Sequence, residues 1–262
     1  MRILVILAFM AQLLMAAEPS AAVRTILESK DFHQRLDAVH SLNDNLSQTD
    51  RQALYDLLVR PEGYRGEAVL ENDLLNVLRR SNDPRLDKVL LHMARDPQQD
   101  SVIRDYALQH LGLWYPMARN KPEIRETLWQ ATDLTGNSMA GTALLALLRQ
   151  APVDPEIDRS RLGRRALEIA SDRSAGELSR ITALRICGQL NKTEALEPAL
   201  GLVHGDASIS LQLAAIATIG DLGDDRQTEL LQKLANSGSK RLAHAAAIAL
   251  DKLKDKRTGA GS

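Results

Sequence analysis

The sequence predicts an all-α protein in which about seven helical hairpins stack into an α-α superhelix. Three observations support this fold class. Leu and Ala dominate the apolar residues, which make up 44% of the chain, while aromatic residues contribute only 3%. One pattern of small and apolar residues recurs along most of the chain, and strand-like alternation with turn pairs is absent from the sequence. Small and unbranched apolar residues let helices pack closely on helices, whereas sandwiches and barrels use more Val, Tyr, Phe and Trp.

Residues 1–17 have the features of a secretory signal peptide. Arg2 is followed by an uninterrupted apolar run from Ile3 to Ala11, and small residues then precede a polar stretch that contains proline. A short basic start, an apolar stretch and small residues before a polar one are typical of an export signal. Cleavage is expected after Ala17, with Ala22 as the alternative. The mature chain is then exported, periplasmic or extracellular, without a stable membrane span. The competing interpretation is a first buried helix.

The main signal is a repeat that begins near residue 31. A small or apolar residue recurs at an aligned position, with an apolar residue beside it and another four residues on. The aligned position is occupied by Ala38, Leu74, Ala107, Ala143, Ala183, Ala215 and Ala246, at intervals of 31 to 40 residues. Apolar residues at this spacing form one stripe on a helix, and self-similarity at this period is typical of a solenoid. We therefore expect a solenoid over residues 23–253 and a polar, disordered tail over residues 254–262.

Each part of the repeated pattern has an expected physical role. Asp at the start, as at Asp31 and Asp100, caps the exposed N–H groups of the helix. Ala at the aligned position lets the neighbouring helix approach. Gly after the last apolar residue, as at Gly112, is expected to end the helix because glycine adopts the left-handed conformation at little cost. The other helix of each hairpin is expected between the copies, over residues 51–59, 85–93, 124–129, 162–169, 195–203 and 227–234.

This pattern resembles the HEAT repeat family, in particular its short HEAT-like or phycobilisome-lyase-type branch. The residues that carry the resemblance best are Asp100, Val102, Arg104, Ala107, Leu108, Leu111 and Gly112. The resemblance covers roughly residues 31–253, although the copies centred on 74, 143 and 246 lack the Arg. It implies a HEAT-like α-solenoid that serves as a binding scaffold, and with the export signal it implies a secreted, bacterial-type member of the family.

Three interruptions of the repeat are candidate binding regions, because solenoids often bind through loops that are longer than the repeat requires. They are residues 60–66, 114–122 and 151–156. Aromatic residues and Arg are the usual anchors of protein interfaces, and the first two interruptions contain several. The predicted partner-binding residues are Tyr64, Arg65, Trp114, Tyr115 and Arg119. The alternative is that the aromatic pair at 114 and 115 fills the space under an irregular turn.

The residue types that carry catalysis form no recognisable motif. The HEAT-like enzyme deoxyhypusine hydroxylase uses repeated His-Glu pairs to hold two irons, but none of the six histidines here is followed by Glu. A Gly-rich phosphate loop, a Ser nucleophile elbow and zinc-type His or Cys spacing are also missing from the sequence. The single cysteine, Cys187, is expected to be a small buried hydrophobe. We therefore predict no catalytic residue, no metal ligand and no cofactor.

The charge balance narrows the class of partner. The chain has 33 Lys and Arg against 34 Asp and Glu, which argues against a dedicated nucleic-acid binder because such proteins usually carry a basic excess. We expect a non-catalytic scaffold that binds a protein or peptide partner in the cell envelope or outside the cell. Two alternatives stay open. One is an accessory or degenerate enzyme of the lyase or hydroxylase type, and the other is a structural envelope module that assembles with copies of itself.

Overall fold

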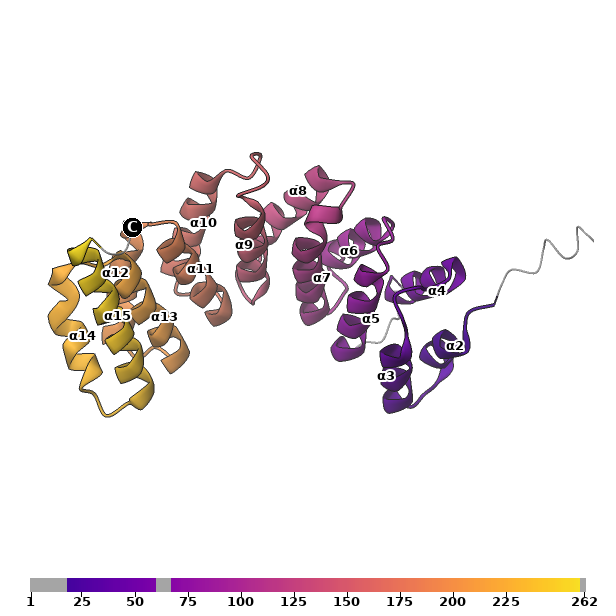
Figure 1. The fold of residues 1–262 in the computed structure, drawn as a ribbon, viewed down its shortest axis with the longest axis horizontal. Coiled ribbons are helices and arrows are strands. Elements are labelled where there is room, and N and C mark those ends of the chain that lie inside the picture. Colours follow the sequence, from indigo (N-terminus) through magenta and orange to yellow (C-terminus); the bar gives the residue numbers. More distant parts are fainter. Residues whose placement is uncertain (1–17, 60–66, 260–262) are drawn as a thin grey trace, which may run out of the picture. The chain divides into compact units, whose positions relative to one another are not determined.

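The computed structural model describes residues 18–59 and 67–259 of the 262-residue chain. Within these ranges the protein is entirely helical, with fourteen α-helices, three short 3-10 helices and no strand (Figure 1). The predicted all-α class is therefore confirmed. The helices follow one another as first and second members of hairpins, which gives the α-α solenoid expected from the repeat.

The first helices of the hairpins are α2 (Ala21–Glu28), α4 (Gln48–Leu58), α6 (Leu86–Arg95), α8 (Lys121–Ala131), α10 (Arg159–Ser171), α12 (Leu196–His204) and α14 (Thr228–Ala235). The second helices are α3 (Phe32–Ser41), α5 (Ala68–Arg80), α7 (Ser101–Trp114), α9 (Met139–Gln150), α11 (Glu177–Gln189), α13 (Ile209–Leu222) and α15 (Lys240–Thr258). The 3-10 helices are η1 (Tyr115–Met117), η2 (Thr193–Ala195) and η3 (Asp225–Gln227). Each aligned position of the repeat lies on a second helix, and all seven are buried, with exposures of 9% or less.

The chain forms two compact units, one up to Ile103 and one from Arg104 onward. In the first unit, α2 packs against α3 and α4, α3 packs against α5, and α4 packs against α5 and α6. In the second unit, α9, α11, α13 and α15 pack one against the next as a row of second helices (Figure 1). The first helices α8, α10, α12 and α14 each pack against the second helix that follows them.

The glycines of the repeat have a different role from the one expected. Gly112, Gly188 and Gly220 each lie inside a second helix rather than at its end. A Cβ atom at Gly112 would stand 2.6 Å from the Cβ of Ala146 on α9, and one at Gly220 would stand 2.9 Å from the Cβ of Ala249 on α15. Both distances are too short for two carbon atoms. The prediction that these glycines end helices was therefore wrong: Gly112 and Gly220 are needed because the next second helix comes this close.

Helix starts and left-handed turns are made by other residues. Asp31 caps α3 as expected, since its carboxylate accepts hydrogen bonds from the backbone N–H groups of His33 at 2.8 Å and Gln34 at 3.1 Å. The left-handed conformation is adopted by Asn82 and Asn191, each with a φ of 52°. Asn tolerates this conformation better than most residues that carry a side chain.

The N-terminal end of the described solenoid begins earlier than the expected residue 23. Helix α2 starts at Ala21, and the Ser20 hydroxyl accepts a hydrogen bond from the backbone N–H of Val23. The Ser20 backbone N–H also donates to the Asp50 carboxylate of α4 at 2.7 Å. Residue 20 is therefore tied to the fold, whereas the predicted signal segment 1–17 lies outside the described residues.

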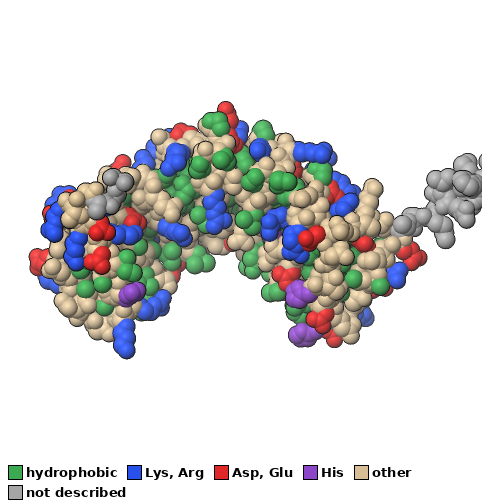
Figure 2. All heavy atoms as spheres, in the orientation of Figure 1, with side chains coloured by type: hydrophobic (Ala, Val, Ile, Leu, Met, Phe, Trp, Pro, Cys, Tyr) green, Lys and Arg blue, Asp and Glu red, His purple; other side chains and the backbone are tan. Residues whose placement is uncertain are grey.

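At the C-terminal end, α15 continues to Thr258 and is followed by Gly259 with a φ of 72°. Residues 254–258, which were expected to be a disordered tail, are helical. None of the helices in the described part of the chain combines the length and the apolar character that crossing a bilayer requires. On the face seen in Figure 2, acidic and basic side chains are interspersed over the described residues of each unit.

Candidate functional site

The predicted partner-binding residues differ in their exposure to solvent, and two of them lie outside the described residues. Tyr64 and Arg65 lie outside the described residues. Trp114 is 3% exposed and Tyr115 is 1% exposed, whereas Arg119 is exposed. Burial of the aromatic pair is the arrangement expected if these rings fill space beneath a turn. A role of the five residues in partner binding stays a prediction.

Tyr115 joins two of the interruptions that the sequence presents separately. Its hydroxyl donates to the Asp154 carboxylate, and Arg125 of α8 donates to the same carboxylate at 2.8 Å. Burial, together with the hydrogen bond to Asp154, raises the pKa of Tyr115 to about 12. Burial opposes ionisation of Asp154, but the hydrogen bonds from Tyr115 and Arg125 hold its pKa below the usual range. These groups satisfy one another, so the cluster stabilises the fold and offers no open site.

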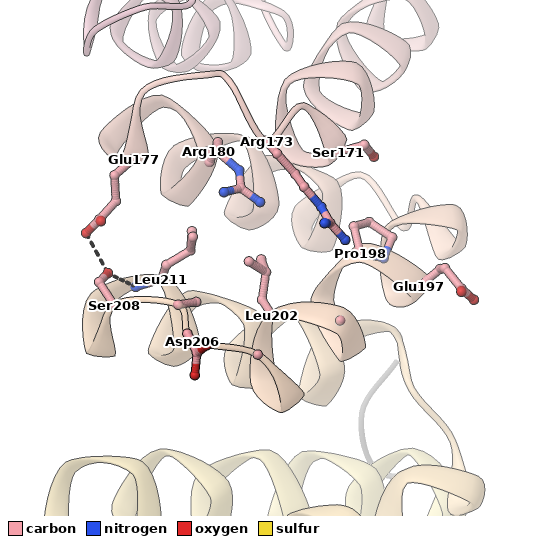
Figure 3. Close-up of a pocket in the computed structure, with 13 residues that line it drawn as sticks. Ser171, Arg173, Glu177, Arg180, Glu197, Pro198, Leu202, Asp206, Ser208 and Leu211 are labelled. Atoms are coloured by element: carbon pink, nitrogen blue, oxygen red, sulfur yellow. Dashed lines mark hydrogen bonds between the residues drawn. The ribbon is translucent and has the colours of Figure 1, made fainter.

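A cleft lies between the α10–α11 hairpin and the α12–α13 hairpin of the second unit (Figure 3). Its volume is about 610 Å³, within the range of roughly 300–1,000 Å³ that is typical of ligand sites. Its walls come from the end of α10, the α10–α11 turn, the first turn of α11, the exposed side of α12 and the α12–α13 turn. Hairpin ends therefore supply most of the lining.

Two arginines form one wall of the cleft. Arg173 lies in the α10–α11 turn and Arg180 in the first turns of α11, and both guanidinium groups point into the space (Figure 3). The Arg180 Nε atom is buried without a hydrogen-bond partner among the described residues. Burial lowers the pKa of Arg180 and the Arg173 charge acts in the same direction, while Asp172 and Glu177 oppose this shift. An unbonded, half-buried guanidinium is the main chemical feature of the cleft.

The opposite wall is apolar. Leu202 of α12 and Leu211 of α13 face the arginines, and Pro198 of α12 lies below Arg173 (Figure 3). Leu211 is 4% exposed, so it is anchored in the core behind the cleft. Gly201 also lines this wall, and a Cβ atom added there would meet nothing within 4 Å. The cleft is therefore open space at this point rather than space filled by neighbouring side chains.

The acidic side chains of the lining do not neutralise the arginines by direct contact. Glu177 accepts a hydrogen bond from the Ser208 hydroxyl at 2.7 Å, and this contact bridges α11 and the start of α13 at one end of the cleft (Figure 3). The carboxylates of Glu197 and Asp206 point away from the space between the two walls (Figure 3). The cleft thus combines a basic wall, an apolar wall and one bridged end.

The repeat shows how the surroundings of Arg180 differ from those of Arg35. Arg180 stands three residues before its aligned alanine, as Arg35 does in α3. Arg35 is paired with Glu67, which precedes the next second helix, α5. The residue at the same place before α13 is Ser208. The position that supplies a carboxylate to Arg35 therefore supplies only a hydroxyl near Arg180, and that hydroxyl is bonded to Glu177.

The sequence carries a signal for this site. The repeat pattern shows where an Arg stands, whereas its ion pairing depends on the residue before the next second helix. Comparing each Arg of the pattern with the residue before the next second helix singles out Arg104 and Arg180, which are followed by Ser138 and Ser208 rather than by a carboxylate. Among the described residues, no three His, Cys, Asp or Glu side chains lie together as ligands for a metal ion. Cys187 is buried as predicted, and burial raises the pKa of its thiol to about 12.

Comparisons with known proteins found the following similarities. Similar solved structures include human deoxyhypusine hydroxylase in complex with glycerol, which is 19% identical, covers 89% of this chain and 95% of that chain, and has a TM-score of 0.40. Another is an engineered protein that is 16% identical, covers 90% of this chain and 97% of that chain, and has a TM-score of 0.30. No curated protein matches the sequence. Residues 165–256, which contain all the residues that line the cleft, match a family model described as HEAT repeats, and this match supports the resemblance expected from the sequence.

Proposed function

We propose that this protein is a non-catalytic HEAT-type scaffold that binds a protein or peptide partner through the cleft between the α10–α11 and α12–α13 hairpins. The observation that carries the proposal is the unbonded Arg180 guanidinium opposite an apolar wall. Interfaces are anchored by Arg beside buried apolar side chains, and solenoids present extended surfaces to their partners. A partner that supplies both polar and apolar groups would satisfy the cleft.

The proposal is tested by site-specific photo-crosslinking in the source cells. Gly201 is replaced by p-benzoylphenylalanine, which projects into open space in the cleft. The matched control carries the same residue at Gly238, which also has no neighbour within 4 Å but lies outside the cleft. We expect a protein adduct from position 201 that disappears when Arg180→Gln is added, and none from position 238. Adducts of equal yield at both positions, or none at position 201, would overturn the proposal.

We further propose that the protein is exported and that its signal segment is removed after Ala17. Ser20 supports this cleavage point, because its hydroxyl caps α2 and its backbone N–H donates to Asp50. Cleavage after Ala22 would remove the cap and the first residues of α2. N-terminal sequencing of the protein recovered from the envelope should therefore begin at Glu18. A first residue of Val23 would contradict the cleavage point, and an intact N-terminus in the cytoplasm would contradict export.

A further inference from the structure

A comparison of equivalent charged residues in the repeat shows that the cleft lacks a carboxylate beside Arg180. In the first unit, the Arg35 side chain is 6% exposed and its charge is met by the Glu67 carboxylate from the next repeat. In the second unit, Arg180 occupies the same place in the repeat, but Ser208 stands where the carboxylate would be. The Arg35 guanidinium is thus paired with a carboxylate of the same chain, whereas the Arg180 guanidinium faces a cleft.

We propose that the cleft binds the C-terminal carboxylate of a peptide whose last side chain is apolar, so that the ligand supplies the carboxylate that the repeat omits at Arg180. The inference rests on the proposed function and specifies its ligand class. A guanidinium group binds a carboxylate through two parallel N–H···O bonds, which is the geometry that Arg favours over other anion-binding side chains. Arg173 adds a second positive charge on the same wall.

The shape of the cleft favours a chain end over an internal acidic side chain. In a C-terminal residue, the carboxylate and the side chain share one Cα atom, so both lie within a few bonds of each other. The arginine wall and the wall of Leu202 and Leu211 face each other across the cleft and match these two groups (Figure 3). The Glu177–Ser208 hydrogen bond crosses one end of the cleft. A chain that terminates in the cleft need not pass this bridge, whereas an internal segment must continue beyond it.

The test measures fluorescence anisotropy of the full-length mature protein with labelled hexapeptide mixtures. The mixtures are randomised at five positions and end in Leu, with either a free carboxylate or an amide at the C-terminus. We expect the amide to weaken binding at least tenfold, and a mixture ending in Asp to bind more weakly than one ending in Leu. Octanoate is added as a competitor, because a small amphipathic carboxylate offers the same chemistry. We expect it to compete only at concentrations far above those of the peptides.

Three variants assign the binding to the cleft. Arg180→Gln should weaken binding of the free-carboxylate mixture at least tenfold, and Gly201→Trp should abolish it by filling open space. Arg226→Gln removes the same charge from an exposed arginine that is paired with Asp224, and it should leave binding unchanged. Circular dichroism melting curves of all three establish that they are folded. Retention of binding by Gly201→Trp would place the peptide elsewhere and overturn the inference.

The outcomes separate the inference from the proposed function. Equal binding of amide and free-carboxylate peptides would overturn the C-terminal inference but leave a peptide-binding cleft. If octanoate binds as tightly as the peptides, the inferred ligand would be a small carboxylate and the peptide inference would be overturned. No peptide binding, together with an Arg180-dependent adduct at Gly201, would overturn the inference alone. Failure of both experiments would remove the inference and the proposed function together.

Discussion

The Arg35 position in the first unit and the Arg180 position in the second unit are equivalent in the repeat, yet their surroundings differ. Arg35 is 5% exposed and forms an ion pair with Glu67. Arg180 is half-buried, forms no ion pair with the residues that the structure describes, and has its pKa lowered by burial. The comparison teaches that a repeat specifies where a charge stands, while the next repeat decides whether that charge is neutralised.

A third member of the series is Glu71, which occupies the corresponding place in α5. It stands three residues before Leu74, where Arg35 and Arg180 have their guanidinium groups. Glu71 is 4% exposed, and one of its carboxylate oxygens has no hydrogen-bond partner among the described residues. Burial and, to a smaller extent, the nearby carboxylates of Glu67 and Asp100 together raise its pKa to about 7. The series therefore contains a paired cation, an unpaired cation and a carboxyl group that resists ionisation.

The largest effect is expected when the paired position is made to resemble the unpaired one. Glu67→Ser leaves the buried Arg35 guanidinium without its carboxylate, and breaking a buried ion pair costs about 3–5 kcal/mol of unfolding free energy. Urea unfolding followed by circular dichroism measures this loss. Ser239→Ala changes the equivalent position before α15, where the side chain makes no capping hydrogen bond, and should have little effect. A loss below about 1 kcal/mol for Glu67→Ser would show that the comparison has no energetic basis.

The next effect is a pH dependence at Glu71. Its pKa is about 7 in the folded protein and 4.5 when unperturbed, so the unfolded chain releases this proton first as pH rises. The contribution of Glu71 to stability is complete below pH 4.5 and is lost as pH rises through 7, by on the order of 3 kcal/mol.

Glu71→Gln isolates this contribution, because glutamine does not titrate. The variant should gain stability relative to the unmodified protein between pH 4.5 and pH 7.5, and urea midpoints across this range measure the gain. Other carboxyl groups titrate in both proteins and cancel in the difference. A difference that stays constant with pH would show that Glu71 ionises normally in the folded protein.

A smaller effect separates closed packing from the open cleft. Gly112→Ala places a Cβ atom 2.6 Å from the Cβ of Ala146 and should cost about 1–3 kcal/mol by overpacking. Gly201→Ala adds the same atom in open space within α12 and should stabilise the helix by about 0.5–1 kcal/mol. Thermal melts of the two variants give shifts of opposite sign. Equal shifts would mean that the close contact between α7 and α9 relaxes without cost.

The smallest effect is expected at the unpaired cation itself. Arg180→Leu removes a guanidinium that forms no ion pair with the residues that the structure describes, so the unfolding free energy should change by less than about 1 kcal/mol. The same urea titration that is used for Glu67→Ser provides the comparison. A loss as large as that of Glu67→Ser would indicate that Arg180 is already neutralised in the folded protein.

The fold was predictable because burial repeats locally along the chain. Ala107 and Ala183, for example, are both fully buried on second helices, as their spacing predicts. The glycine role was mispredicted because a pattern places Gly112 on a helix without showing that Ala146 approaches it. Residues 254–258 are helical although their polar composition predicted disorder.

The candidate site could not be predicted in the same way, because it depends on contacts between distant residues. Tyr115 and Asp154 are 39 residues apart, and each belongs to an interruption with no pattern of its own. The cleft depends on the lack of a carboxylate beside Arg180, which becomes apparent only when Ser208 is compared with Glu67, four repeats earlier in the chain. Local periodicity encodes neither relation.

The buried thiol of Cys187 is an intrinsic probe of local unfolding in α11, the helix that carries Arg180. It is the chain's only cysteine, it is fully buried on α11, and its pKa of about 12 keeps it protonated and unreactive at neutral pH. A thiol reagent can therefore modify the native protein only when α11 opens. The rate of thiol modification therefore measures how often α11 opens by local unfolding, and no label has to be introduced. A ligand that bridges α11 and α12 should lower the rate of Cys187 modification in proportion to the fraction of protein that is bound.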